Sequence, residues 1–152
     1  LYQRWRASLV ANQFLYMEAT NTPSFLLLDI PGTTEISMSF DANMQPVVAY
    51  VQDGAAKLYW FDSVSSGFVT TNFGSAIKTP RVALDDHRFA ASNGFQLSDV
   101  IFAYVKDSSL CYRQQRDRYL TERVLKTGLR ADQGLLKIGL NRKLRFQFMV
   151  SP

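Results

Sequence analysis

The sequence contains very few of the side chains that disulfide scaffolds and metal centres use. Its 152 residues include one cysteine, Cys111, and one histidine, His87. A single cysteine cannot form an internal disulfide, and no Cys-x-x-Cys or paired Cys/His spacing of the kind that binds zinc is present. These absences exclude a disulfide-stapled fold and a cysteine-based zinc site, and we expect neither a metal nor a cofactor.

Long apolar runs are also missing. No stretch of about 18 apolar residues occurs, so we expect no membrane span. The N-terminus "LYQRWRASL" has no initiator methionine and lacks the charged and then apolar layout of a signal peptide. A start of this kind is expected for a processed chain or for a piece of a longer protein.

Catalytic motifs are absent as well. The chain has no Gly-x-Ser-x-Gly, no His-Glu-x-x-His and no P-loop. The densest polar cluster is "LDDHRF" (84–89), but neighbouring residues of a strand point to opposite faces, which separates His87 from the adjacent acids. Asp41 ends a comparable strand earlier in the chain, which indicates a turn-forming role for these acids. We therefore predict no catalytic residue and no enzyme.

What the sequence does contain is apolar and aromatic residues in short runs. It is 47% hydrophobic and 13% aromatic, and a chain of this length can bury roughly 68–70% of its unfolded surface as one domain. Runs rich in Val, Ile, Phe, Tyr, Trp and Thr are separated by turn residues about every 8–12 residues, which is typical of antiparallel β proteins. The segment 114–130 contains helix-forming residues but lacks an apolar stripe at helical spacing. We predict an all-β antiparallel fold.

Two segments of the chain repeat each other. The stretch "VVAYVQDGAAKLYWFDSVSSGFVTTNFG" (47–74) aligns with "IFAYVKDSSLCYRQQRDRYLTERVLKTG" (101–128), with Tyr50 on Tyr104. After a two-residue deletion in the turn, Trp60 falls on Tyr112. Short strands at 35–41 and 80–86 precede the two copies. The repeat unit is therefore a leader strand, a hairpin of two strands and a closing strand.

Weaker copies flank these two. "QFLYMEATNTPSFLLLD" (13–29) places Tyr16 at the position of Tyr50 and Asp29 at that of Asp62, and "LLKIGLNRKLRFQFMV" (135–150) supplies another hairpin. The copies cover about 1–34, 35–74, 79–128 and 129–150 of a single domain, 1–152. Because they recur, we predict packing and turn roles for seven residues: Tyr16, Asp29, Tyr50, Trp60, Asp62, Tyr104 and Tyr112.

Four-stranded antiparallel units repeated radially are the layout of β-propeller blades. The sequence leaves a small propeller-like fold and an open β-meander as alternatives. The last unit lacks its closing strand, and we expect "LYQRW" (1–5) to supply it, which would also pair two free edges.

Positive charge is concentrated in the second half of the chain. Residues 106–145 contain eleven Lys/Arg and four acids, in a chain of net charge +4. This distribution suits an anionic partner or the acidic face of a neighbouring subunit, but the simpler interpretation, a solvated basic face, is the one that the sequence favours. The interleaved arginines and tyrosines of 111–120 also suit DNA passing through a channel. The candidate interface residues are Arg113, Arg116, Arg118, Arg142, Lys143 and Arg145.

The third copy contains an insertion, "HRFAASNGFQLS" (87–98), which we interpret as a loop. Such a loop at the end of a repeat unit is a candidate contact for a partner, and its candidate residues are His87, Arg88, Phe89, Asn93 and Phe95.

Three stretches of the second half carry a resemblance: "SDVIFAYV" (98–105), "YRQQRDRY" (112–119) and "IGLNRKLRFQF" (138–148). Together they resemble virion structural proteins of tailed bacteriophages, tail or tail-neck components with tandem β repeats. The resemblance implies a non-enzymatic structural role in a phage tail, location in the virion, and ring-like assemblies with copies of itself and other tail proteins. The alternative is a recognition propeller that binds a host glycan or protein through its loops.

Overall fold

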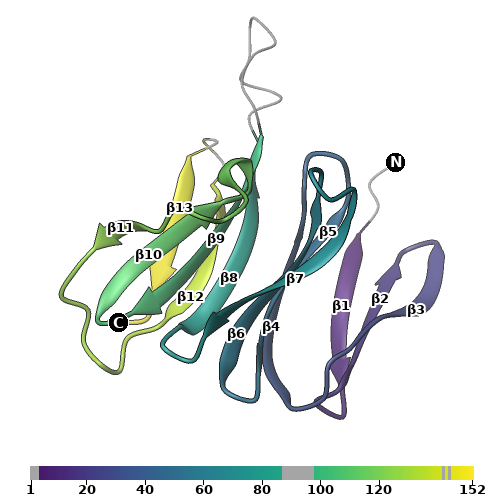
Figure 1. The fold of residues 1–152 in the computed structure, drawn as a ribbon, viewed down its shortest axis with the longest axis horizontal. Coiled ribbons are helices and arrows are strands. Elements are labelled where there is room, and N and C mark those ends of the chain that lie inside the picture. The colour runs from purple at the N-terminus through teal and green to yellow at the C-terminus, as the bar shows by residue number, and fades with distance from the viewer. Residues whose placement is uncertain (1–3, 87–97, 142, 144) are drawn as a thin grey trace, which may run out of the picture.

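A computed structural model of the chain describes residues 4–86, 98–141, 143 and 145–152. These residues form thirteen strands and one 3-10 turn, η1 (Gln115–Asp117), and they contain no α-helix (Figure 1). All strand pairs are antiparallel. The predicted all-β antiparallel class is therefore confirmed, and the described segment 114–130 contains no α-helix.

The strands belong to four sheets, each of which follows the order of the chain. The first sheet contains β1 (Trp5–Val10), β2 (Phe14–Ala19) and β3 (Thr22–Asp29). The second contains β4 (Thr33–Phe40), β5 (Pro46–Gln52), β6 (Ala55–Asp62) and β7 (Gly67–Gly74). The third contains β8 (Lys78–Asp85), β9 (Asp99–Lys106), β10 (Ser109–Gln114) and β11 (Arg123–Lys126). The fourth contains β12 (Leu135–Leu140) and β13 (Phe146–Val150).

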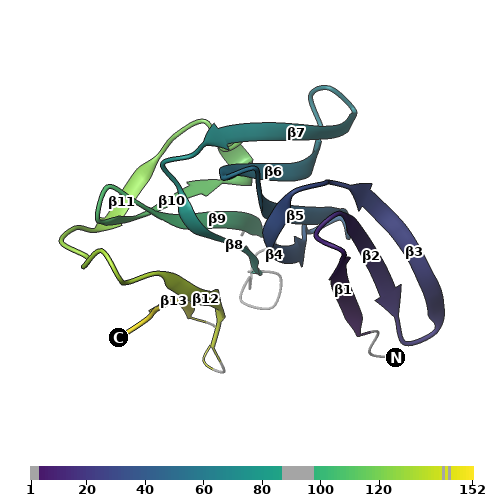
Figure 2. The same ribbon diagram turned by 90° about the horizontal axis from the view of Figure 1, so that it is seen from below.

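The four sheets lie face against face in an open arc (Figures 1 and 2). Three apolar clusters join consecutive sheets. In β5, Val47 and Ala49 face the third sheet, whereas Val48 and Tyr50 face the first. Because both faces of this strand are covered, its sequence is continuously apolar rather than alternating.

The first strands of neighbouring units lie beside one another and are joined by side chains. The amide of Val82 in β8 donates to Ser37 Oγ of β4 at 3.0 Å, and the amide of Leu135 in β12 donates to Thr79 Oγ1 of β8 at 2.8 Å. Arg81 spans all three strands, since it contacts Glu35 Oε2 at 3.2 Å and the Leu136 carbonyl at 3.1 Å.

The second and third sheets contain all four strand positions of the repeat unit, as the sequence indicated. Their hairpins β5–β6 and β9–β10 turn on two residues each, Asp53-Gly54 and Asp107-Ser108, all with positive φ. The two turns have the same length, so the two-residue deletion that the sequence alignment placed in the second turn is not present. Ala49 pairs with Leu58, and Ala103 pairs with Tyr112. Tyr112 therefore corresponds to Leu58 and not to Trp60 as predicted.

The first sheet contains the second, third and fourth positions of the unit. Its β1–β2 loop has two consecutive residues with positive φ, Ala11 and Asn12, as in the turns of β5–β6 and β9–β10. The predicted match of 13–29 with the central hairpin was wrong by one strand, and Tyr16 on β2 does not correspond to Tyr50. Alternating strands resemble one another, so the pattern alone did not reveal the shift.

The fourth sheet contains only the first two positions. Asn141 Oδ1 accepts hydrogen bonds from the amides of Lys143 and Arg145, at 2.8 and 3.0 Å. Asp41 Oδ1, in the β4–β5 loop, accepts from the amides two and four residues later in the same way, at 2.8 and 2.9 Å. Thus β12–β13 correspond to β4–β5, and the predicted match of 135–150 with the central hairpin was also wrong by one strand.

The N-terminal strand does not complete the last unit. Trp5 pairs with Ala19 in the first sheet, and β1 lies at the opposite end of the arc from β13 (Figure 1). The expectation that 1–5 would close the fold is therefore wrong for the described residues Arg4 and Trp5. The first strand had a nearer partner, because β2 follows it after a short loop.

Candidate functional site

The densest group of polar contacts lies where the segment 113–122 passes between the second and third sheets. After β10 ends, η1 and two residues with positive φ, Arg118 and Tyr119, reverse the chain. The Tyr119 side chain is buried and packs edge-on against the Trp60 ring, with centroids 5.1 Å apart. This aromatic contact anchors a turn whose charged side chains then reach strands of both sheets.

Arg118 joins the third sheet to the second. Its Nε and Nη2 donate to the two carboxylate oxygens of Asp62 at 3.2 and 2.6 Å, in the bidentate geometry typical of strong Arg–carboxylate pairs. Asp62 ends β6, is only 2% exposed, and also accepts a hydrogen bond from the Val64 amide. The hydrogen bonds from Arg118 lower the pKa of Asp62 against the opposing effect of burial.

The neighbouring residues of η1 make similar contacts. The Arg116 amide and Nε donate to Asp99 at 3.0 and 2.5 Å, and Asp99 is buried at the start of β9. The hydrogen bond to Asp99 raises the pKa of Arg116. Gln115 Nε2 donates to Asp41 Oδ2 at 3.2 Å across the sheet boundary. Side chains of the short segment 115–118 therefore donate hydrogen bonds to three buried carboxylates, those of Asp41, Asp62 and Asp99.

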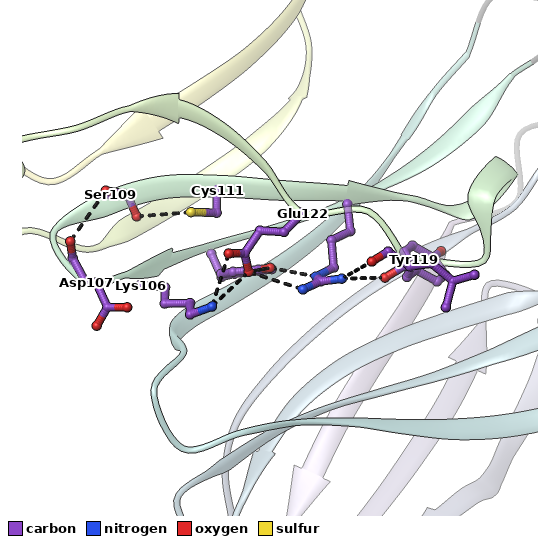
Figure 3. Close-up of polar contacts among 9 residues, drawn as sticks. Lys106, Asp107, Ser109, Cys111, Tyr119 and Glu122 are labelled. Carbon is purple, nitrogen blue, oxygen red and sulfur yellow. Dashed lines mark hydrogen bonds and ion pairs between the residues drawn. The ribbon is translucent and has the colours of Figure 1, made fainter.

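A second group surrounds the Tyr104 hydroxyl. Tyr104 donates to Glu122 Oε2 at 2.6 Å and accepts from Arg113 Nε at 2.8 Å. Lys106 Nζ lies 3.1 Å from Glu122 Oε1 (Figure 3). Arg113 also donates to the carbonyls of Tyr119 and Leu120, at 2.9 and 2.7 Å. This group ties the turn to β9 and β10.

The pKa values of Tyr104, Cys111 and Glu122 indicate which side chains of this group are ionised at neutral pH. Burial and the adjacent Glu122 raise the pKa of Tyr104, and burial raises the pKa of the Cys111 thiol, so both remain protonated at neutral pH. Burial opposes ionisation of Glu122, but hydrogen bonds from Tyr104 and Lys106 prevail and lower its pKa. The network thus holds ionised, mutually neutralising pairs and no deprotonated nucleophile among these residues, and its physical effect is to fix the segment after β10 on β9 and β10 of the third sheet.

The structure brings three predicted interface residues together and gives them internal partners. Arg113, Arg116 and Arg118 each contact a carboxylate of this chain. Their predicted contact with an external anion stays a prediction, although their charge is already matched. Lys143 and Arg145 are exposed in the β12–β13 loop. Six predicted contact residues lie outside the described residues: His87, Arg88, Phe89, Asn93, Phe95 and Arg142.

Most of the predicted repeat residues lie inside the molecule. Tyr50, Trp60 and Tyr104 are buried in the clusters between sheets. Tyr16 and Tyr112 are half-buried, and Asp29 is exposed, where it accepts a hydrogen bond from Gln13. Sequence reasoning missed Glu122, Asp99 and Asp41 as partners of the arginines. The sequence does show that acidic residues recur at strand ends, but nothing in it indicates that these acids pair with the arginines of 113–118.

The two end sheets expose charged side chains together with large apolar ones, among them Leu26 on the first sheet and Met149 on the fourth. Arg6 and Glu18 of the first sheet form an ion pair at 3.5 Å. Counted from the hairpin turn, these two residues correspond to the paired Val48 and Tyr59 of the second sheet. On the fourth sheet a shallow hollow of about 300 Å³ is lined by seven residues, Lys137, Ile138, Gly139, Leu140, Asn141, Gln147 and Met149.

Within the described residues, no group of three His, Cys, Asp or Glu side chains gathers to hold a metal ion. No helix in this part of the chain has the length and hydropathy needed to cross a membrane. Comparison with protein-family models, curated proteins and solved structures found no match for the chain.

Proposed function

We propose that this protein is a non-enzymatic structural module that works by forming interfaces in a larger assembly. The observation that carries the proposal is the use of its charged side chains. Buried Asp62 and Asp99 and half-buried Glu122 are matched by Arg118, Arg116 and Arg113 of the segment 113–118, and the Asp62–Arg118 pair joins the second sheet to the third. These charged side chains do not converge on a cavity. A chain that is made rigid by such internal pairs is suited to form contacts with other proteins.

The resemblance of the second half to tail and tail-neck proteins supports a bacteriophage tail as the setting. The partners we propose are other copies of the chain and other virion tail proteins. Exposed Lys143 and Arg145 offer positive charge to an acidic partner surface or to DNA in a channel.

Strand edges are the surfaces best suited to these contacts. The Arg6–Glu18 pair on the first sheet and Lys137 on the fourth would have to be desolvated if another sheet were stacked on either end face. An open edge needs only main-chain hydrogen bonds to extend a sheet. We therefore place the assembly contacts at edges and their flanking basic residues.

The test is the mass of the native protein in solution by light scattering, with and without the double substitution Lys143→Glu and Arg145→Glu. We expect a multimer or larger assembly that the double variant weakens by about tenfold in dissociation constant, because it reverses two exposed charges. The matched control is Arg4→Glu at the far end of the arc. A stable monomer that binds a glycan array would contradict the proposal and favour the recognition function.

A further inference from the structure

The outer edge of β7 lies in the interior of the chain, and it is open although the chain continues directly into β8. β7 is the last strand in the order of the second sheet and pairs only with β6 among the described residues. β3 and β11 are the outermost strands of the first and third sheets in the same way. One row of backbone N–H and C=O groups on β7 therefore has no ladder partner in this part of the chain.

β7 lacks the features that protect the other two outer edges. β3 contains Pro23, and its pairing with β2 is irregular at two places. β11 has only four residues and carries Arg123 and Lys126 at its ends. β7 has eight residues, "GFVTTNFG", with no charge and no proline, and its pairing is irregular only beside its last residue, Gly74. A long, uncharged and regular edge is a template for strand addition.

The position of β7 allows the second sheet to be extended. Figures 1 and 2 show β7 at the outer side of the arc, between β3 and β11 and apart from both. The Phe68 ring on β7 is stacked on Tyr59, with centroids 4.9 Å apart, and packs edge-on against Phe61 at 5.4 Å. Phe68 is nevertheless 41% exposed, and an added strand would cover part of this apolar surface.

The side chains of β7 indicate a second copy of the same strand as the partner. When a strand pairs with its own copy about a twofold axis perpendicular to the sheet, the two strands are antiparallel and opposite residues lie on the same face. With Thr71 opposite Thr71, the other pairs are Val69 with Phe73, Thr70 with Asn72, and Phe68 with Gly74. Threonine against threonine and a β-branched residue against an aromatic ring are favourable cross-strand pairs. In this register β7 is complementary to itself.

Charge favours the same partner. Because β7 carries no charged side chain, its own copy brings no like charges together. Antiparallel pairing of β11 with its own copy would instead place Arg123 of one strand near Lys126 of the other. On β3, Pro23 has no N–H to donate to an added strand. Of these three outer strands, β7 is the one suited to pair with itself.

We propose that two copies of the chain join through β7, antiparallel and with Thr71 opposite Thr71, so that their second sheets become one continuous sheet. This inference rests on the proposed function, since it assigns one of the assembly contacts to a named edge and to a second copy. The contact uses main-chain hydrogen bonds that the edge already presents, so neither copy has to rearrange.

Cysteine substitutions on β7 test the register. Opposite residues of an antiparallel pair have Cα atoms about 4.5–5.5 Å apart, which a disulfide can span. Oxidation with diamide should therefore join two copies of Thr71→Cys at least about tenfold faster than two copies of Asn72→Cys, whose thiols are offset along the strands. The control is Ser24→Cys, an exposed position on β3, which should not join copies. The native Cys111 is buried and is present in every variant.

Amide exchange of the unsubstituted chain tests the edge directly. As the protein concentration rises and copies associate, exchange of alternate amides of β7, those that point away from β6, should slow by at least about tenfold. The amides of β11 that point away from β10 serve as the control, and their exchange should not change with concentration.

A charge placed on the edge should block the contact. Asn72→Lys should raise the dissociation constant of the pair about tenfold or more, because lysine on an edge strand opposes strand addition. Asn72→Ser removes the same hydrogen bond to the Gly74 amide without adding a charge, and it should associate like the wild type. Ser24→Lys adds the same charge on β3 and should have no effect.

The outcomes separate this inference from the proposed function. A multimer whose β7 amides exchange at the same rate at every concentration would overturn the inference and leave the proposed function in place. Disulfide formation that is as fast for Asn72→Cys or Ser24→Cys as for Thr71→Cys would overturn it as well. A chain that stays monomeric at every concentration would contradict both.

Discussion

At the scale of single residues, the arginines of 113–118 are matched by carboxylates from distant strands. Asp62 lies 56 positions from Arg118, and Asp99 lies 17 from Arg116. Each carboxylate is almost fully buried, and a buried carboxylate without such a partner would be strongly destabilising. The segment around η1 and the second sheet therefore stabilise each other through the contact between Arg118 and Asp62.

Substitution of Asp62 should make this dependence visible through pH. Because its pKa is lowered in the folded protein, the ionised carboxylate contributes stability above its unfolded pKa of about 4, and this contribution is lost as the pH falls through the folded value. Asp62→Asn should thus lower the urea midpoint near pH 7, and the difference from the wild type should shrink near pH 3.

The matched control is Asp132→Asn, since Asp132 forms an exposed ion pair with Arg130. Its urea midpoint should equal that of the wild type at both pH values, as is usual for exposed pairs. A difference between Asp62→Asn and the wild type that stays constant with pH would show that the Asp62 charge does not stabilise the fold.

At the scale of elements, the loops identify the strand positions more reliably than the strands do. The β4–β5 and β12–β13 loops each place an Asp or Asn at the first residue, where its side chain accepts two backbone amides. This is a known turn-stabilising role of both residue types. The two loops share this geometry although their remaining residues differ.

Asp41→Ala and Asn141→Ala should each reduce the free energy of unfolding by about 1 kcal/mol or more, because two backbone amides lose their acceptor. The reduction should be larger for Asp41, which is buried and also accepts from Gln115. Asp41→Asn should retain most of the stability, since Asn141 makes the same two bonds. Chemical denaturation measures all three, and an Asp41→Asn protein as unstable as Asp41→Ala would contradict the shared role.

At the scale of the whole molecule, consecutive sheets are joined by apolar clusters and by side chains that cross the boundaries. Leu15, Leu58 and Leu135 are fully buried, and each belongs to a different cluster. Arg81 and Arg118 connect strands of different sheets. We therefore expect the arc to unfold as one cooperative unit.

Leu15→Ala, Leu58→Ala and Leu135→Ala should each cost about 2–5 kcal/mol. Each should shift a single transition, with tryptophan fluorescence and far-UV circular dichroism coinciding. Leu136→Ala is the control, because Leu136 is 53% exposed and its truncation should cost less than about 0.5 kcal/mol. Separate transitions in the Leu15→Ala protein would show that the first sheet folds independently.

The sequence by itself determined the fold class, the turns and the repeat of the two central units. Runs such as "KLYWFD" consist of strand-forming aromatic and apolar residues, and Asp-Gly at 53–54 suits the positive φ of a tight hairpin, so this information is local. The alignment of Tyr50 with Tyr104 held because both lie on the buried second strand of a complete sheet.

Only the tertiary structure decided the strand positions of the end sheets and the partners of the charged residues. A shift of one strand, or of two residues along a strand, leaves an alternating pattern intact, so Tyr16 and Tyr112 were assigned to the wrong positions. The arginines looked like an external surface because their acids lie 9 to 56 residues away. Such pairings depend on how sheets stack, and that is set by packing between faces, which no single segment of the chain encodes.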